Sequence, residues 1–222
     1  MIPRILSVVA LLLAPLWLAG CQSGPAPTVE MLRVALFPVQ PSGAGLDPQF
    51  TYLRVTGRQR VAFFVLGYAD PHPQGVIEVW YSADREALRL QNGRVVGLSG
   101  SLTEWRQVRL PMLPSWAELL AQNGTFQWKR SRDVMPGYRF NLLDQLQLQP
   151  IPAPGKSALV GMDAAELRWF EERMSATSAG AEPLPPARYA LQMVQGQAVV
   201  VYGEQCISSD FCITWQRWKP QP

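Results

Sequence analysis

The sequence predicts a mainly β protein, and three observations lead to that prediction. Twenty prolines and seventeen glycines are spread over 222 residues, which favours many turns over long helices. Val, Ile, Phe, Tyr and Trp are frequent between them, and these residues suit the half-buried surface of a sheet. Ten or so short apolar segments follow one another with short connections, which is typical of a β-barrel or a β-sandwich.

The strand predictions follow from alternating or continuous apolar runs bounded by turn residues. Residues 60–69 are a continuous apolar run whose length and aromatic content suit a buried strand. Residues 28–37 fit either a helix or a first strand. The other predicted strands are residues 49–56, 76–82, 87–90, 94–98, 125–134, 138–149, 189–194, 197–203 and 213–218.

Two dipeptides predict hairpin turns, and one segment predicts a short helix. Asn92-Gly93 is the strongest hairpin signal, because both central residues of a type I′ turn need a positive φ. Gln195-Gly196 predicts a second hairpin. The helix is expected over residues 115–122, because Ser115 and Glu118 have capping-box spacing and Asn123-Gly124 can end it.

Residues 165–174 give two conflicting signals. Asp163 and Glu166 have the spacing that caps a helix, whereas Leu167, Trp169 and Glu171 alternate as in a strand. The segment therefore fits either a helix or a strand.

The amino terminus has the features of a secretory signal. Arg4 precedes an apolar run of about 14 residues, which is shorter than the roughly 20 that a membrane-spanning helix needs. The run ends in Leu18-Ala-Gly-Cys21, which resembles the lipobox of bacterial lipoproteins. We therefore expect residues 1–20 to be a signal peptide and Cys21 to carry lipid, and acylation with two or more chains anchors a protein stably to a membrane.

The mature chain is expected to be a tether followed by one domain. Residues 21–28 hold the lipidated cysteine and a small, polar, Pro- and Gly-containing stretch that cannot bury apolar surface. Residues 29–222 show no repeat or change in composition, which predicts a single β-rich domain. Gln22 stands where inner-membrane lipoproteins of enterobacteria have Asp, and this favours the periplasmic face of the outer membrane.

Charge and cysteine content restrict the partners and the cofactors. A net charge of +3 with 17 % charged residues does not support nucleic-acid binding. Cys206 and Cys212 form an even pair, and the periplasm is oxidising, so we predict a disulfide between them. His72 is the only histidine, so we expect no metal site and no cofactor.

Residues 80–100 (WYSADREALRLQNGRVVGLSG) resemble the YjbF/GfcB family, the lipoproteins of exopolysaccharide and group 4 capsule operons. The matching features are a Trp-x-Ser strand, an acidic turn, an apolar strand, Asn-Gly-Arg, a β-branched pair and a closing Gly-Leu element. The resemblance implies a large, mostly antiparallel β-barrel-like domain, here with one or two short helices. It also implies a role in surface polysaccharide production or export without an established enzymatic activity.

The residues do not support a catalytic centre, and none is predicted. His72 lies in a proline-bracketed turn and no nucleophile elbow accompanies it. Glu166, Glu171 and Glu172 form the densest acidic cluster, but adjacent carboxylates on a strand point to opposite faces. We interpret them as solvated charges beside Arg168 and Arg173.

Seven tryptophans of the mature chain could pack in a core or stack on sugars. Trp128 is the candidate contact for glycan or a partner, because the basic residues Lys129 and Arg130 follow it. The alternative for this basic run is a solvated edge strand.

These observations favour a non-enzymatic, outer-membrane-anchored periplasmic lipoprotein in exopolysaccharide or capsule assembly and export. Its expected partners are the membrane, through the lipid, and polysaccharide or polysaccharide-export proteins. A carrier of lipid or lipoprotein with an apolar cavity is the first alternative, and a tryptophan-filled interior would count against it. A polysaccharide-modifying enzyme is the second alternative.

Overall fold

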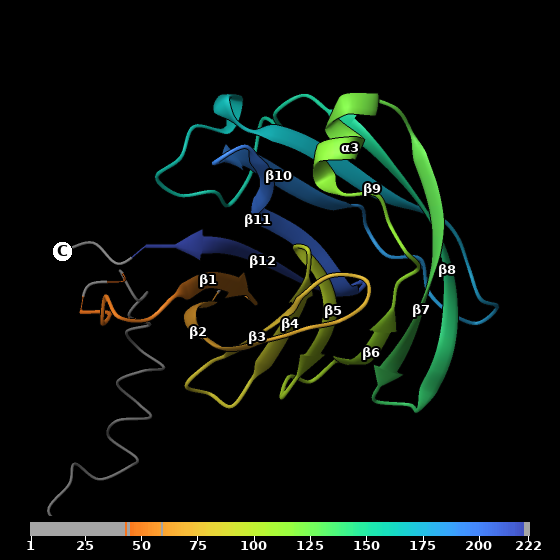
Figure 1. Ribbon diagram of the computed structural model, residues 1–222. Coiled ribbons are helices and arrows are strands. Elements are labelled where there is room, and N and C mark those ends of the chain that lie inside the picture. Colours follow the sequence, from red (N-terminus) through yellow and green to blue (C-terminus); the bar gives the residue numbers. More distant parts are fainter. Residues whose placement is uncertain (1–42, 44, 59, 220–222) are drawn as a thin grey trace, which may run out of the picture. The chain divides into compact units, whose positions relative to one another are not determined.

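A computed structural model describes residues 43, 45–58 and 60–219. Twelve antiparallel strands close into a barrel, as Figure 1 shows. The mainly β, barrel-like fold is therefore confirmed. The predicted signal peptide, Cys21, the tether and the ambiguous residues 28–37 lie outside the described residues.

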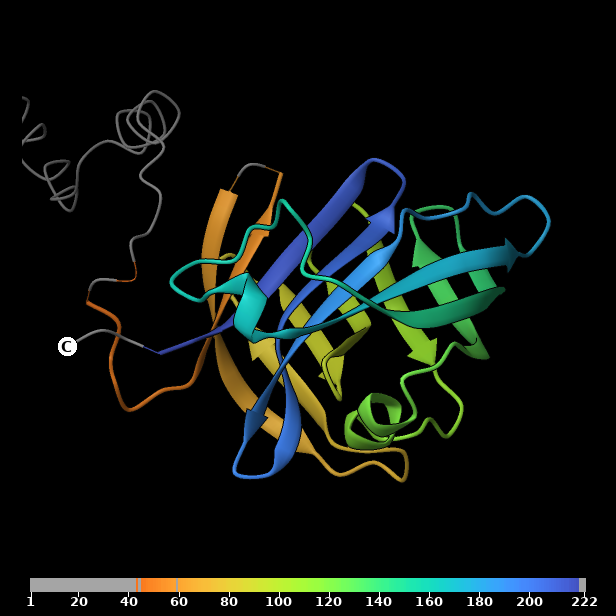
Figure 2. The ribbon, with the colours of Figure 1, turned by 90° about the horizontal axis from the view of Figure 1, so that it is seen from above.

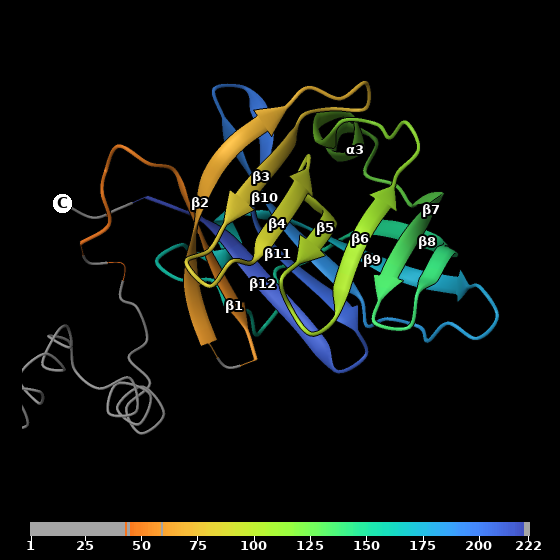
Figure 3. The same cartoon turned by 90° about the horizontal axis from the view of Figure 1, so that it is seen from below.

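The barrel is a meander in which each strand pairs with the strands before and after it in the chain. The strands are β1 (Tyr52–Gly57), β2 (Arg60–Asp70), β3 (Ile77–Tyr81), β4 (Ala87–Gln91), β5 (Arg94–Ser99), β6 (Glu104–Arg109), β7 (Phe126–Met135), β8 (Arg139–Ile151), β9 (Arg168–Thr177), β10 (Ala187–Val194), β11 (Gln197–Ser208) and β12 (Phe211–Trp218). The first and last strands close the ring, with Tyr52 opposite Trp218 and Gly57 opposite Ile213. β5 and β6 share one ladder pair, Leu98 with Trp105, and Figure 3 shows these strands on the near side.

Both hairpin signals are confirmed by the backbone. Asn92 and Gly93 have φ values of 48° and 77° between β4 and β5. Gln195 and Gly196 have φ values of 50° and 80° between β10 and β11. Each pair supplies the two positive φ angles of a tight turn whose twist matches the adjoining strands.

The predicted short helix is α3 (Trp116–Gln122), and its ends are capped as expected. The Ser115 side chain accepts from the Glu118 backbone N–H, and the Glu118 side chain accepts from the Ser115 backbone N–H. Asn123 ends the helix in the left-handed conformation. α3 buries Trp116 and Leu119, and Figure 2 shows it at the same end of the barrel as the β2–β3 loop and the β10–β11 hairpin. No helix among the described residues combines the length and apolar character needed to cross a membrane.

Both patterns at residues 165–174 correspond to structure: a short 3-10 turn forms first and a strand follows it. Asp163 caps a single 3-10 turn, η2 (Ala164–Glu166), with its side chain accepting from the Ala165 N–H. Leu167 then takes an extended backbone and β9 begins at Arg168. The capping residues therefore start a turn that is too short to become a helix.

Two details of the strand predictions were wrong. β2 was expected to be a buried strand, but only Phe64 in it is buried and its last four residues, 67–70, are exposed. β6 was not predicted, since its sequence (EWRQVR) carries three charges and buries only Trp105 and Val108.

Apolar side chains pack on both sides of the barrel wall. The main core lies inside and includes Trp80, Trp105 and Trp215, each fully buried. A second cluster lies outside β9–β11, where Trp169 and Tyr202 pack against the loop that contains Ala158, Leu159 and Met162. The Ala158 N–H donates to the Tyr202 hydroxyl at 2.9 Å, which ties this loop to the barrel wall.

Candidate functional site

The interior between β5 and β9 holds five charged side chains, and each is at most 5 % exposed. Residues at alternate positions share one face of a strand, and Arg130 of β7 lies directly opposite Asp144 of β8. The three guanidinium groups and two carboxylates belong to Arg94, Arg130, Arg132, Asp144 and Glu172. When all five are ionised, one positive charge is in excess.

Asp144 is the best-satisfied member of this interior cluster. Its Oδ2 accepts from the Arg130 Nε at 2.8 Å and the Arg132 Nε at 2.7 Å, and its Oδ1 accepts from the Thr177 hydroxyl at 2.7 Å. Burial alone would raise the pKa of Asp144, but these hydrogen bonds and the two positive charges lower it overall. Asp144 therefore stays ionised and holds the two arginines in place.

Glu172 and Arg94 are less well matched. Glu172 Oε1 lies 3.7 Å from Arg130 Nη1, and its Oε2 lies 3.9 Å from Arg94 Nε. Both distances exceed those of a hydrogen bond. Burial raises the pKa of Glu172, and the attraction of Arg130 and Arg94 does not reverse that shift.

Aromatic rings surround the arginines of the cluster. The Arg94 Cζ lies 4.0 Å from the centroid of the Trp116 ring, 5.3 Å from that of Trp128 and 5.7 Å from that of Tyr189. Trp116 is fixed by a 2.7 Å hydrogen bond from its indole N–H to the Asn92 carbonyl. Arg130 lies over Trp105 at 4.8 Å. These cation–π contacts offset part of the cost of burying the charges.

Glu171 and Glu172 point to opposite sides of β9, as expected for neighbours on a strand. Outside the barrel, Glu171 accepts from the Arg173 Nε at 2.7 Å and the Arg188 Nε at 3.2 Å. The interpretation of both as solvated charges was wrong, because each is only 4 % exposed and lies against arginines. Glu166, in η2, is exposed.

The three candidate contact residues of β7, Trp128, Lys129 and Arg130, do not lie on the same face of the strand. Trp128 and Arg130 lie on the inner side of β7, since their ladder partners Leu146 and Asp144 are buried, whereas Lys129 is exposed. The structure does not bring all three candidate residues to one surface, because residues 128 and 130 alternate with residue 129. Trp128 and Arg130 instead lie inside the barrel, in the same cluster as Arg94.

Sequence reasoning missed Arg94 and Asp144, which complete the interior cluster. Asp144 occupies an even position in the series Leu142, Leu146 and Leu148, so the alternation that predicted β8 also predicts an inward carboxylate. For Arg94, which follows the Asn92-Gly93 turn, no comparable signal was available. The sequence also did not indicate that two aromatic residues at the β7–β8 turn lie on the surface. Tyr138 is 73 % exposed and Phe140 is 61 % exposed.

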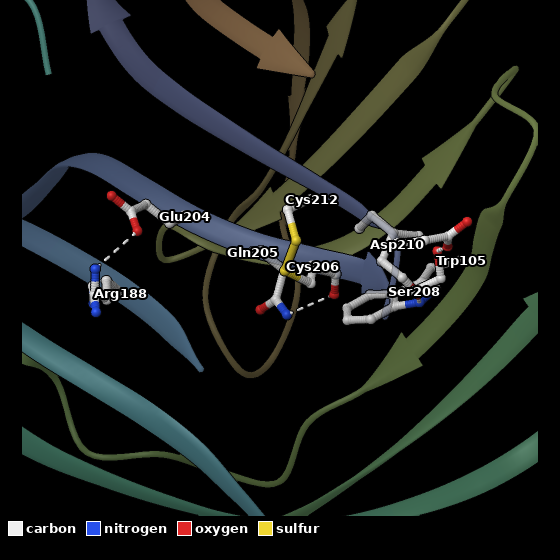
Figure 4. Close-up of a disulfide and its surroundings, with 9 residues drawn as sticks. Trp105, Arg188, Glu204, Gln205, Cys206, Ser208, Asp210 and Cys212 are labelled. Carbon is white, nitrogen blue, oxygen red and sulfur yellow. Dashed lines mark hydrogen bonds and ion pairs between the residues drawn. A yellow bond between two sulfur atoms is a disulfide. The ribbon is translucent and has the colours of Figure 1, made fainter. Parts of the chain in front are cut away.

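The predicted disulfide joins Cys206 and Cys212, which face each other across β11 and β12. Figure 4 shows it on the sheet with Gln205, whose side-chain N–H donates to the Cys206 carbonyl at 3.0 Å. Within the described part of the chain, no three His, Cys, Asp or Glu side chains are grouped so that they could hold a metal ion. His72 is exposed in its proline-bracketed loop, where its Nδ1 accepts from the Gln74 N–H.

Comparison with protein families matches residues 46–183 to the family described as group 4 capsule polysaccharide lipoprotein GfcB, YjbF. The chain belongs to this YjbF family. The resemblance of residues 80–100 is thereby confirmed, and the chain is a capsule polysaccharide-associated lipoprotein by family.

Among solved structures, the YjbF-family chain is similar to the crystal structure of the hypothetical lipoprotein YmcC from Escherichia coli (K12). The TM-score is 0.56 at 15 % sequence identity, over 90 % of this chain and 99 % of YmcC. At that identity the likeness shows the fold. No curated protein matches the chain.

Proposed function

We propose that this lipoprotein is a non-enzymatic accessory in the assembly or export of capsule polysaccharide or exopolysaccharide. Lipid on Cys21 holds it on the periplasmic face of the outer membrane, and it acts by binding the polymer or proteins of the export machinery. Membership of a capsule polysaccharide lipoprotein family supports the polysaccharide part of the proposal.

The placement of the carboxylates supports the proposal that the protein is not an enzyme. Hydrolysis of a glycosidic bond uses two carboxyl groups that face the same bond. Glu171 and Glu172 face opposite sides of the barrel wall, and Asp144 is bonded to two arginines and a threonine. None of these three groups is free to act with another on one substrate.

The carrier alternative is disfavoured by what fills the interior. A cavity for acyl chains needs a continuous apolar lining, whereas this interior holds the side chains of Trp80, Trp105 and Trp215 and five charged groups. Burying hydrocarbon beside unpaired charge is costly.

A deletion strain complemented with the gene tests the proposal. Deletion is expected to lower the yield of surface or secreted polymer and to leave the sugar composition and linkages of the remainder unchanged. Normal yield with altered linkages or chain length would contradict a non-enzymatic role.

Of the three candidate contact residues, Trp128, Lys129 and Arg130, Lys129 is the exposed one. Complementation with Lys129→Ala is expected to lower polymer yield if the outer face of β7 is a contact surface. Lys156→Ala is the control, because Lys156 is also an exposed lysine but lies in the loop between β8 and η2. Equal yields from both variants would remove β7 from the contact surface.

A further inference from the structure

One edge of the Arg94 guanidinium makes no hydrogen bond, and its neighbouring carboxylate oxygen, Glu172 Oε2, lies 3.9 Å from Nε. Nε and Nη2 form the edge that binds a carboxylate or phosphate through two parallel hydrogen bonds. Both nitrogens are buried, and neither has an acceptor among the described residues. Buried donors in native proteins almost always have a partner, so two donors on one edge without a hydrogen bond call for an acceptor that the described protein atoms do not supply.

Two further polar groups beside Arg94 are also unpaired. The Trp128 indole N–H is buried without an acceptor in the described chain, and its ring lies 5.3 Å from the Arg94 Cζ. Glu172 Oε2 is buried without a donor and lies 3.9 Å from Arg94 Nε. Burial raises the pKa of Glu172, which favours its uncharged form over the ionised one.

Charge and shape define the ligand that suits these donors. Even with Asp144 and Glu172 both ionised, the three guanidinium groups leave one positive charge in excess, so the interior favours an added anion. The Trp116, Trp128 and Tyr189 rings gather around Arg94, and such rings stack on the apolar faces of sugars.

We propose that Arg94 is the receptor for the carboxylate or phosphate of an acidic sugar residue, held inside the barrel beneath α3. The anion follows from the unpaired donors, whereas the choice of a sugar rests on the proposed function. The Trp116 ring covers Arg94 at 4.0 Å and is one of two buried side chains of α3. Displacement of this short helix therefore uncovers the site.

Ligand-dependent thermal stability of the purified full chain tests the proposal. The probes are D-glucuronate, glucose 1-phosphate, neutral D-glucose, acetate and inorganic phosphate. A saturable rise in Tm with D-glucuronate or glucose 1-phosphate is expected, because a ligand that binds only the folded chain stabilises it. D-glucose has no anion and is expected to have no effect. The stronger of the two acidic sugars identifies the anion as carboxylate or phosphate.

Three variants separate a binding site from a structural ion cluster. Arg94→Gln is expected to weaken binding at least tenfold. Trp128→Phe keeps an aromatic ring but loses the indole N–H together with the second ring, and it is expected to bind about three- to tenfold more weakly. Arg217→Gln is the control, because Arg217 also lies over a tryptophan, Trp80 at 5.9 Å, but is paired with Glu78.

Unchanged Tm with both acidic sugars up to tens of millimolar would overturn the proposal. Acetate and inorganic phosphate acting as strongly as the acidic sugars would overturn it as well, because the site would then not select a sugar. Either result leaves the deletion experiment unaffected, since polymer yield is scored independently of any ligand bound by Arg94.

Discussion

Asp144 and Glu172 are both carboxylates inside the barrel, yet their surroundings shift their pKa values in opposite directions. Hydrogen bonds from arginine side chains outweigh burial at Asp144, whereas burial outweighs two distant guanidinium groups at Glu172. The difference comes from contacts of 2.7–2.8 Å at Asp144 against 3.7–3.9 Å at Glu172. Two side chains of similar chemistry therefore contribute differently to stability as the pH changes.

Glu172→Gln is expected to become more stabilising, relative to wild type, as the pH rises. The folded-state pKa of Glu172 lies above its ordinary value of 4.5, so the folded chain keeps a proton that the unfolded chain loses. This group stabilises the fold below that value, and the contribution is lost as the pH rises through the folded pKa. Urea denaturation from pH 4.5 to pH 8 measures the difference, with the exposed Glu182→Gln as control. A constant difference across this range would contradict the raised pKa.

Asp144→Asn is expected to have the opposite pH dependence and a larger cost. It leaves Arg130 and Arg132 buried without their carboxylate, and breaking a buried ion pair costs about 3–5 kcal/mol. The folded pKa of Asp144 is below 3.8, so its contribution is present above that value and disappears as the pH falls through the folded pKa. Denaturation midpoints at pH 7 and pH 3 test this. A loss of similar size at both would show that ionisation of Asp144 is not the cause.

At the scale of elements, the β11–β12 hairpin carries the covalent cross-link. The disulfide joins directly opposed residues that are six positions apart, so it closes a small loop. Cys206→Ser and Cys212→Ser are each expected to lower the free energy of unfolding by about 2 kcal/mol, because either removes the same constraint on the unfolded chain. Two free thiols in the mass spectrum of non-reduced protein would contradict the cross-link, as would clearly unequal losses.

Features that depend on residues close in sequence, such as turns and helix caps, could be predicted. Features that depend on residues far apart in sequence, such as the burial of Glu172, could not. Asn92-Gly93 and the Ser115–Glu118 capping box act within a few residues, and both structures form as predicted. The burial of Glu172 depends on Arg130, which is brought to it by the registers of β7, β8 and β9. Without those registers, a pair of glutamates beside arginines resembles a solvated surface, because charged residues are rarely buried unless paired.

At the scale of the whole molecule, the proposed anchor and the barrel are separate parts of the chain. Cys21→Ala is expected to abolish lipid labelling and to release the protein from membranes, because the lipid supplies the membrane affinity. Membrane fractionation and lipid labelling measure the effect, with Cys206→Ser as a control that leaves Cys21 in place. Membrane association as firm as that of wild type would contradict lipid anchoring at Cys21.

In a closed ring where each strand pairs with its sequence neighbours, the chain could start at any strand. The point where the lipid anchor joins the barrel is therefore not fixed by the fold. Because Tyr52 is paired with Trp218, a short linker could join the start of β1 to the end of β12, and new termini could be opened at Gln195-Gly196. Such a circular permutant keeps every strand pairing and loses only the covalent link between β10 and β11. A lipid-bearing leader fused at the new terminus would then attach the same barrel to the membrane at its β10–β11 corner.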